Sequence, residues 1–188
     1  MRIVSGKFRG KLIHNPIDKT TRPLKDMVRE SIFNILEHSR NEKINLKGKI
    51  ILDMFSGSGS FGIECLSRGA EHVYFYENYK NVHKILKKNI DELKIDNFST
   101  IFEKSAYDIS EVDIQCQRLD LVFLDPPFKD KNIDDLLQII KKLNILNKDT
   151  LFVIHRNKKT TDKFGKDFLV LREQKYGLSK IIFGKFLL

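Results

Sequence analysis

An aspartate, two prolines and a phenylalanine stand together at residues 125–128, directly after an apolar run at residues 119–124. A carboxylate and a proline carbonyl can both accept hydrogen bonds from an amino group, and consecutive prolines have no backbone N–H to compete for those oxygens. The exocyclic amine of a nucleic-acid base is a weak nucleophile because its lone pair is delocalised into the ring. Two acceptors favour a pyramidal nitrogen that can attack a methyl group, and an aromatic face can stack the extruded base.

A rigid turn is the alternative interpretation of residues 125–128, but it gives no role to the aromatic residue. The segment predicts methyl transfer without a metal, with these catalytic residues: Asp125, Pro126, Pro127 and Phe128.

A glycine-rich segment with the spacing of nucleotide-binding loops occupies residues 57–62, between an apolar run and a helical pattern. Glu77 ends the next apolar run, where it is expected to accept hydrogen bonds from ribose hydroxyls. Asp53, which ends the apolar run before this segment, decides between NAD and S-adenosylmethionine as the cofactor. A carboxylate near a pyrophosphate is repulsive by about 1 kcal/mol at ~4 Å even in water. S-adenosylmethionine carries an ammonium and a sulfonium and no phosphate, so Asp53 favours it over NAD.

The elements that would position these residues follow from hydrophobic periodicity. Apolar runs alternate with helical patterns from Lys49 onward, which predicts a doubly wound, mostly parallel sheet. Two final runs around Tyr176 and Gly177 predict an antiparallel hairpin that brings the sheet to seven strands. The predicted strands are 50–53, 73–77, 98–102, 119–124, 151–154, 168–172 and 180–186. One predicted helix follows the glycine-rich segment and ends at Ser67, and two others span 81–93 and 134–143.

The first part of the chain differs from this pattern. Residues 2–13 are basic and punctuated by glycine, which predicts a small hairpin, and residues 26–36 have the spacing of an amphipathic helix. We therefore expect an N-terminal RNA-binding appendage at residues 1–46 on a methyltransferase domain at residues 47–188.

Composition narrows the class of protein. A length of 188 residues with 41% hydrophobic content is enough for one domain with a sizeable core. The formal net charge of +9 favours a polyanionic partner, although a solvated lysine-rich surface would look the same. Cys65 and Cys116 are far apart and form no CxxC motif, so neither a disulfide framework nor a zinc site is expected. Without an apolar leader or a run of ~18 apolar residues, we expect a soluble cytoplasmic protein with no membrane contact.

Several stretches resemble the bacterial RsmD family, whose members methylate the N2 amino group of guanine in small-subunit ribosomal RNA. The resemblance covers nearly the whole chain and implies a Rossmann-like class I S-adenosylmethionine-dependent methyltransferase fold. It also implies a guanine of 16S rRNA as substrate, within a partly assembled small (30S) subunit. The matching residues are 2–12 (RIVSGKFRGKL), Thr21-Arg22-Pro23, Asp26, Val28-Arg29-Glu30, Phe33–Leu36, 53–59 (DMFSGSG), Gly62, Glu64, 66–70 (LSRGA) and 122–128 (VFLDPPF).

The resemblance and the loop pattern together give a set of expected contacts. The expected cofactor-binding residues are Asp53, Phe55, Ser56, Gly57, Gly59, Glu77, Ser105, Ala106 and Asp125. The expected RNA-binding residues are Arg2, Lys7, Arg9, Lys11, Arg22 and Arg29. The chain departs from the family at Leu24-Lys25, where Thr-Thr is usual, at Met27, and at Ser105, where Asp or Asn is usual. His155 stands where relatives more often end the fifth strand with an acid, and we interpret it as structural or incidental.

Three other functions share parts of these patterns. The DPPF segment also fits an adenine-N6 or cytosine-N4 methyltransferase acting on DNA or other RNA. A NAD-dependent oxidoreductase fits the glycine spacing, but Asp53 and the DPPF segment oppose it. A non-catalytic RNA-binding ribosome assembly factor fits the charge, but it has no use for an intact Asp125 and cofactor loop. We expect a monomer.

Overall fold

Seven strands form one sheet in the order β3-β2-β1-β4-β5-β7-β6. The computed structural model describes residues 1–16, 24–114 and 118–188. Strands β3, β2, β1, β4 and β5 pair in parallel, whereas β7 runs antiparallel between β5 and β6. The predicted fold class, a mostly parallel sheet with a C-terminal antiparallel hairpin, is confirmed. The strands are β1 (Ile50–Met54), β2 (His72–Tyr76), β3 (Ser99–Phe102), β4 (Leu121–Leu124), β5 (Leu151–Asn157), β6 (Phe168–Tyr176) and β7 (Ser179–Phe186).

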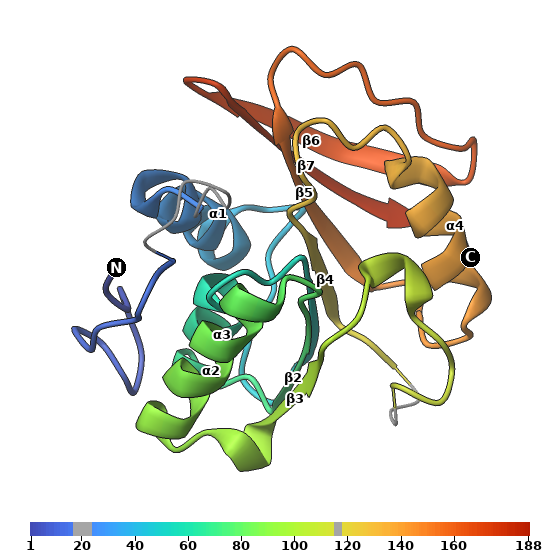
Figure 1. Cartoon of the computed structure of the whole chain (residues 1–188). Coiled ribbons are helices and arrows are strands. Elements are labelled where there is room, and N and C mark those ends of the chain that lie inside the picture. Colours follow the sequence, from blue (N-terminus) through green and yellow to red (C-terminus); the bar gives the residue numbers. More distant parts are fainter. Residues whose placement is uncertain (17–23, 115–117) are drawn as a thin grey trace.

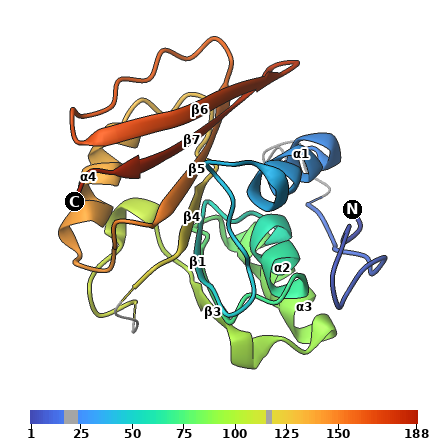
Figure 2. The ribbon, with the colours of Figure 1, turned by 180° about the vertical axis from the view of Figure 1, so that it is seen from behind.

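Helices cover both faces of the sheet. Figures 1 and 2 show α1, α2 and α3 on one face and α4 on the other. The helices differ from the predicted ones by one or two residues at their ends, and β3 starts one residue late because a short 3-10 turn precedes it. The described helices are α1 (Asp26–His38), α2 (Ser60–Ser67), α3 (Lys80–Leu93) and α4 (Ile133–Lys142), with 3-10 turns η1 (Asp96–Phe98) and η2 (Ala106–Asp108). None of these helices is long and apolar enough to cross a membrane.

Alternate residues of each strand enter two separate hydrophobic cores. On β4, for example, Leu121 and Phe123 pack with α1, α2 and α3, whereas Val122 and Leu124 pack with α4. The same alternation holds on β5 and β7, because successive side chains of a strand point to opposite faces. The same alternation predicts the face of the sheet to which a side chain points when its residue directly follows a strand.

The N-terminal segment lies against α2. The expected hairpin is reduced to a loop closed by one antiparallel bridge between Arg2 and Leu12. The Glu64 carboxylate of α2 accepts hydrogen bonds from the amides of Val4 and Ser5, at 2.8 and 2.9 Å. The apolar side chains of this segment join the core on the α2 face, so the segment shares its core with the rest of the chain.

Candidate active site at the carboxyl edge of the sheet

Three polar side chains meet where β4, β5 and β7 reach one edge of the sheet. Asp125 follows β4, His155 lies near the end of β5, and Ser179 begins β7. Asp125 continues the series of Leu121 and Phe123, so it points to the face that carries α1 and α2. His155 and Ser179 belong to the corresponding series of their strands. Because β7 is antiparallel, its first residue lies at the edge where the parallel strands end.

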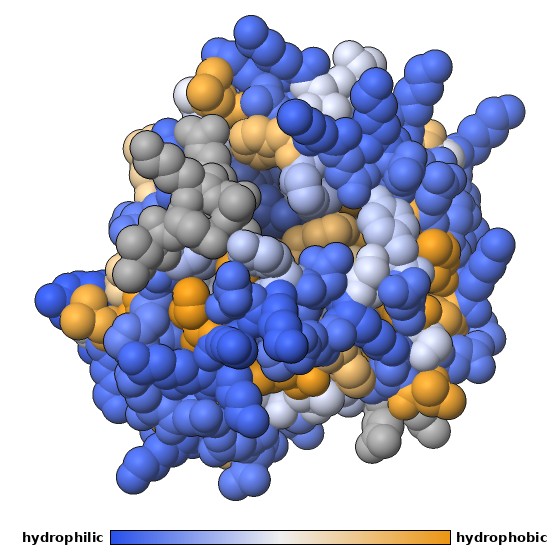
Figure 3. All heavy atoms as spheres, viewed as in Figure 1, coloured by the Kyte–Doolittle hydropathy of each residue, from blue (hydrophilic) through white to orange (hydrophobic). Residues whose placement is uncertain are grey.

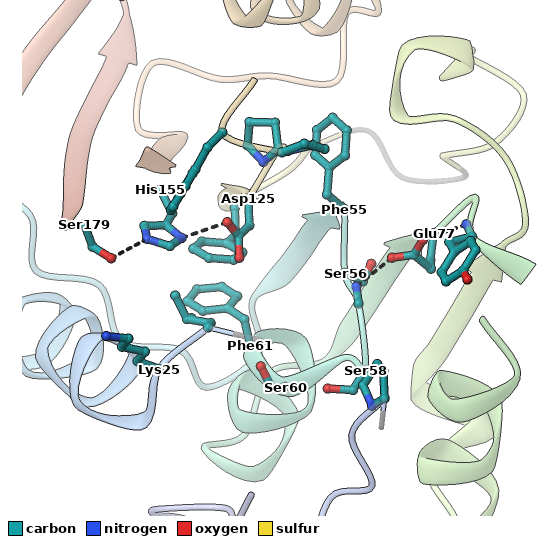
Figure 4. Close-up of a pocket in the computed structure, with 18 of the residues that line it drawn as sticks. Lys25, Phe55, Ser56, Ser58, Ser60, Phe61, Glu77, Asp125, His155 and Ser179 are labelled. Carbon is teal, nitrogen blue, oxygen red and sulfur yellow. Dashed lines mark hydrogen bonds and ion pairs between the residues drawn. The ribbon is translucent and has the colours of Figure 1, made fainter. Parts of the chain in front are cut away.

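The three side chains form a continuous hydrogen-bonded chain. His155 Nδ1 lies 2.7 Å from Asp125 Oδ1, and His155 Nε2 lies 2.8 Å from the Ser179 hydroxyl oxygen. Figure 4 shows the imidazole ring lying between its two partners. His155 and Ser179 are each only 7% exposed, so this chain is largely shielded from solvent. The interpretation of His155 as merely structural overlooked this contact with the predicted catalytic carboxylate.

The DPPF segment leads into a loop that is held from two sides. The buried Arg156 guanidinium donates to the carbonyl of Asp130, and the Tyr107 hydroxyl donates to the Asp130 carboxylate at 2.8–2.9 Å. Phe128 meets the His155 ring edge-to-face, with centroids 5.6 Å apart. These contacts fix the loop that carries Pro126, Pro127 and Phe128 over the strand ends.

The glycine loop is held in place from β2. The Glu77 carboxylate accepts hydrogen bonds from the amides of Gly57 and Tyr79, at 2.9 and 2.7 Å. The Ser56 hydroxyl donates to the carbonyls of Asp53 and Tyr76. Gly57 has a φ of +57°, and a Cβ built there would meet no protein atom within 4 Å. The backbone at Gly57 is therefore open toward the neighbouring space, whereas Gly59 caps α2 with its φ of +81°.

Asp53 occupies a different position from the one expected. It is fully buried, its Oδ2 accepts a hydrogen bond from the Gly62 amide at 2.9 Å, and its Oδ1 has no partner among the described residues. Burial raises the pKa of this carboxyl to about 8 against the opposing Gly62 hydrogen bond, with Asp125 and Glu77 adding to the rise. The argument that its negative charge opposes a pyrophosphate is wrong at neutral pH, since the group then holds a proton. Asp53 orders the start of α2 and does not line the cavity described next.

A cavity of about 460 Å³ joins the glycine loop to the DPPF segment. Its size falls within the ~300–1,000 Å³ of small-molecule sites. Figure 4 shows Glu77 at one end, Ser179 and Lys25 toward the other, and Asp125 between them. In the face drawn in Figure 3, hydrophilic residues dominate, and hydrophobic residues appear in and beside a hollow. The lining residues are Pro16, Leu24, Lys25, Phe55, Ser56, Gly57, Ser58, Ser60, Phe61, Glu77, Asn78, Tyr79, Phe123, Asp125, Pro126, Pro127, Phe128, His155, Leu178 and Ser179.

The end of the cavity near the glycine loop suits a nucleoside cofactor with a charged tail. The Glu77 oxygens retain lone pairs for ribose hydroxyls, the open backbone at Gly57 allows close approach, and Phe55 and Tyr79 offer aromatic surface. Ser105 and Ala106 do not line this cavity, and the Ser105 hydroxyl instead accepts from the Tyr107 amide in η2. No group of three or more His, Cys, Asp or Glu side chains in the described ranges is arranged to hold a metal ion.

The predicted RNA-binding residues fall into three groups. Arg2, Lys7, Arg9 and Lys11 are exposed on the N-terminal loop, where Lys7 and Lys11 flank the Phe8 ring. The prediction that Arg29 binds RNA is wrong: the residue is 0% exposed, and its guanidinium donates to the Arg2 carbonyl and to Asp26. Arg22 lies outside the described residues.

Comparisons with known proteins identify the family of the chain. The model of the family described as Conserved hypothetical protein 95 matches residues 1–185. The ribosomal RNA small subunit methyltransferase D of Haemophilus influenzae is 30% identical over 95% of this chain and 90% of its own length. A Bacillus subtilis protein provisionally named as the rRNA methyltransferase YlbH is 29% identical over 98% of both chains. The crystal structure of an H. influenzae protein provisionally described as a methylase has 28% identity and a TM-score of 0.76, over 99% of this chain and 98% of that one. The chain therefore belongs to the family of Conserved hypothetical protein 95, the RsmD family of methyltransferases.

Proposed function

We propose that this protein transfers a methyl group from S-adenosylmethionine to the N2 amino group of a guanine in 16S rRNA. The single observation that carries the chemistry is the position of Asp125 and Pro126 in one cavity with the glycine loop and Glu77. The choice of ribosomal RNA follows the name of the H. influenzae relative and the basic N-terminal loop. The choice of guanine N2 follows the family resemblance.

Different residues along the cavity bind the cofactor and the target base. S-adenosylmethionine supplies the electrophilic methyl group when it is bound. Glu77 holds the ribose hydroxyls, and Gly57 leaves room for the chain that carries the sulfonium. Asp125 and the Pro126 carbonyl accept the two amine hydrogens, and Phe128 stacks the base, which aligns the nitrogen lone pair with its target. Asp125 then takes the proton that the methylated amine releases.

The basic N-terminal loop supplies the contact with the RNA backbone. It lies against the C-terminal end of α2, while the N-terminal end of the same helix reaches the cavity. The eight residues of α2 span about 12 Å at ~1.5 Å per residue. Lys7, Lys11, Arg2 and Arg9 would therefore hold phosphates near a base that has been flipped into the cavity. Lys25, at the mouth, extends this contact. We further propose that the protein acts as a monomer on a partly assembled 30S particle.

The function can be tested by methyl transfer to defined substrates. The purified protein is incubated with labelled S-adenosylmethionine and with undermethylated 30S particles, naked 16S rRNA or DNA, and the labelled nucleoside is identified after digestion. We expect N2-methylguanine, formed best in the particles. N6-methyladenine, or label in DNA alone, would contradict the proposal.

A pair of aspartate variants tests the division of roles. Asp125→Ala is expected to abolish transfer while the dissociation constant for S-adenosylmethionine, measured by calorimetry, stays close to that of the wild type. Asp149→Ala, at an exposed position after α4, is the matched control and should keep full activity. If Asp125→Ala also loses cofactor binding, the assignment of Asp125 to the base is wrong.

The salt dependence of RNA binding tests the basic loop. Each phosphate contact adds about 0.7–0.9 to the slope of log K against log salt. Lys11→Ala should reduce this slope by roughly 1, whereas Lys142→Ala, on the opposite face of the sheet, should leave it unchanged. An unchanged slope in Lys11→Ala would remove that residue from the RNA contact.

A further inference from the structure

His155 is the only charged or titratable side chain that the described structure places in contact with the Asp125 carboxylate. It binds Asp125 Oδ1 at 2.7 Å, while Oδ2 has no hydrogen-bond partner among the described residues. The Asp125 side chain is 18% exposed and lines the cavity, so Oδ2 is the oxygen left for a ligand. No lysine or arginine forms an ion pair with Asp125 in the described ranges, so His155 is its partner there.

The partners of the imidazole fix its tautomer. An ionised carboxylate oxygen can only accept a hydrogen bond, so in a neutral imidazole Nδ1 must carry the proton. Nε2 then accepts from the Ser179 hydroxyl at 2.8 Å. The Asp125 carboxylate thus fixes the tautomer, and the Ser179 hydroxyl, which can donate as well as accept, satisfies Nε2 and orients the ring.

We propose that His155 and Ser179 are positioning residues that hold Asp125 with Oδ1 occupied and Oδ2 presented to the amine. This inference rests on the proposed function and deepens it. As the new C–N bond forms, the S–CH₃ bond breaks and the amine becomes a cation. One N–H bond then breaks, its proton passes to Asp125 Oδ2, and the electron pair stays on nitrogen. His155 keeps its proton on Nδ1 throughout, and Asp125 returns its proton to water when the product leaves.

The same three residue types form the triad of serine hydrolases, but their exposure here is reversed. In a hydrolase the serine meets the substrate and the aspartate is buried. Here Asp125 is the most exposed of the three: 18% of its side chain is accessible against 8% for that of His155, and Ser179 as a whole residue is 7% exposed. All three residues line the cavity, but the Ser179 hydroxyl is bound to His155 Nε2, whereas Asp125 Oδ2 has no partner among the described residues and is left for a ligand.

Two substitutions of His155 separate its two contacts. In His155→Asn the amide nitrogen can replace Nδ1 and keep the bond to Asp125. In His155→Gln it falls near the position of Nε2 and keeps only the bond to Ser179. We expect kcat to fall about 10- to 100-fold in His155→Gln, because this is the effect of losing one hydrogen bond to a charged group. KM and cofactor affinity should stay unchanged. His155→Asn should recover most of this loss, and Ser179→Ala should lower kcat less than His155→Gln.

The rank order of the variants decides the role. If His155 only supports the fold, both variants lose kcat in proportion to their loss in melting temperature, and this result would overturn the proposal. Covalent labelling of Ser179 by a fluorophosphonate, with activity retained in His155→Gln, would also overturn it.

A measurement without activity keeps this inference separate from the proposed function. In protein labelled with ¹⁵N-histidine, the His155 signals are assigned by their absence from His155→Gln. We expect the neutral ring to be the Nδ1–H tautomer, with a shift toward Nε2–H in Asp125→Asn. An Nε2–H tautomer in the wild type would overturn the positioning role. If the tautomer is as expected but no substrate is methylated at guanine N2, the proposed function fails while the positioning of Asp125 stands.

Discussion

Replacing Asp53 by asparagine should make the stability of the protein less dependent on pH. Asp53 is fully buried, and burial raises its pKa from the usual 3.8 of an aspartate to about 8. Between these two values the folded protein holds a proton on this carboxyl and the unfolded chain does not. The free energy of unfolding is therefore highest below pH 3.8, where both states hold the proton, and it falls as the pH rises toward 8.

The size of the effect follows from one proton. A difference of one bound proton changes the free energy of unfolding by about 1.4 kcal/mol per pH unit. From pH 5 to pH 7 the wild type should thus lose about 3 kcal/mol relative to Asp53→Asn, whose amide does not titrate in this range. The measurement is urea denaturation followed by circular dichroism at pH 5, 6 and 7, with the two proteins compared at each pH.

Asp120→Asn provides the matched control. Burial alone would raise the pKa of Asp120, but the Ile50 amide and the Lys49 ammonium outweigh it and hold the pKa below the usual value. Asp120 is then ionised in both states from pH 5 to pH 7, so its variant should differ from the wild type by a constant amount. A constant difference for Asp53→Asn as well would refute the assignment of a buried, protonated carboxyl beneath the glycine loop.

Two further substitutions test packing and the correction at Arg29. Gly62→Ala should destabilise the protein by about 1–3 kcal/mol in thermal or urea denaturation, because the new Cβ would lie 2.3 Å from Phe75 Cε1 and 2.8 Å from Val73 Cγ1; an unchanged stability would mean that α2 is not held tightly against β2. Arg29→Met should leave the salt dependence of RNA binding as it is in the wild type, since the guanidinium is buried against the Arg2 carbonyl; a slope reduced as in Lys11→Ala would restore Arg29 to the RNA-binding surface.

The sheet could be predicted because its signals are local. Each buried strand is a short apolar run, and each crossover is a helical pattern, so the order of elements is visible in the sequence. The DPPF segment is also continuous, so its position after β4 fixed its place at the carboxyl edge. The start of β3 could not be predicted in this way, because Asp96–Phe98 turn in a 3-10 conformation before the strand begins.

Contacts between distant residues could not be predicted in the same way. His155 meets Ser179 across 24 residues, and this contact depends on the antiparallel register of β5 and β7. Arg29 was assigned to the surface because its charge, and not its place in the helical period, was considered. On α1 it falls between Val28 and Ile32, on the buried side. The pKa of Asp53 depends on three-dimensional burial, which a strand-end carboxylate does not reveal in sequence.

The antiparallel β7 gives the cavity two walls with different tolerance to change. The wall near Gly59 and Gly62 packs tightly, because a Cβ at either position would strike side chains of α2, α3 or β2. The opposite wall contains Leu178, at the tip of the β6–β7 hairpin, where Gly177 has open space around it. A hairpin tip can change in length or sequence while its strands keep their pairing. Gly177 itself has a φ of +56°, at which a side chain would be strained, so divergence toward a new target base is least constrained at Leu178. We expect a library at that position to alter substrate choice without disturbing the binding of the methyl donor.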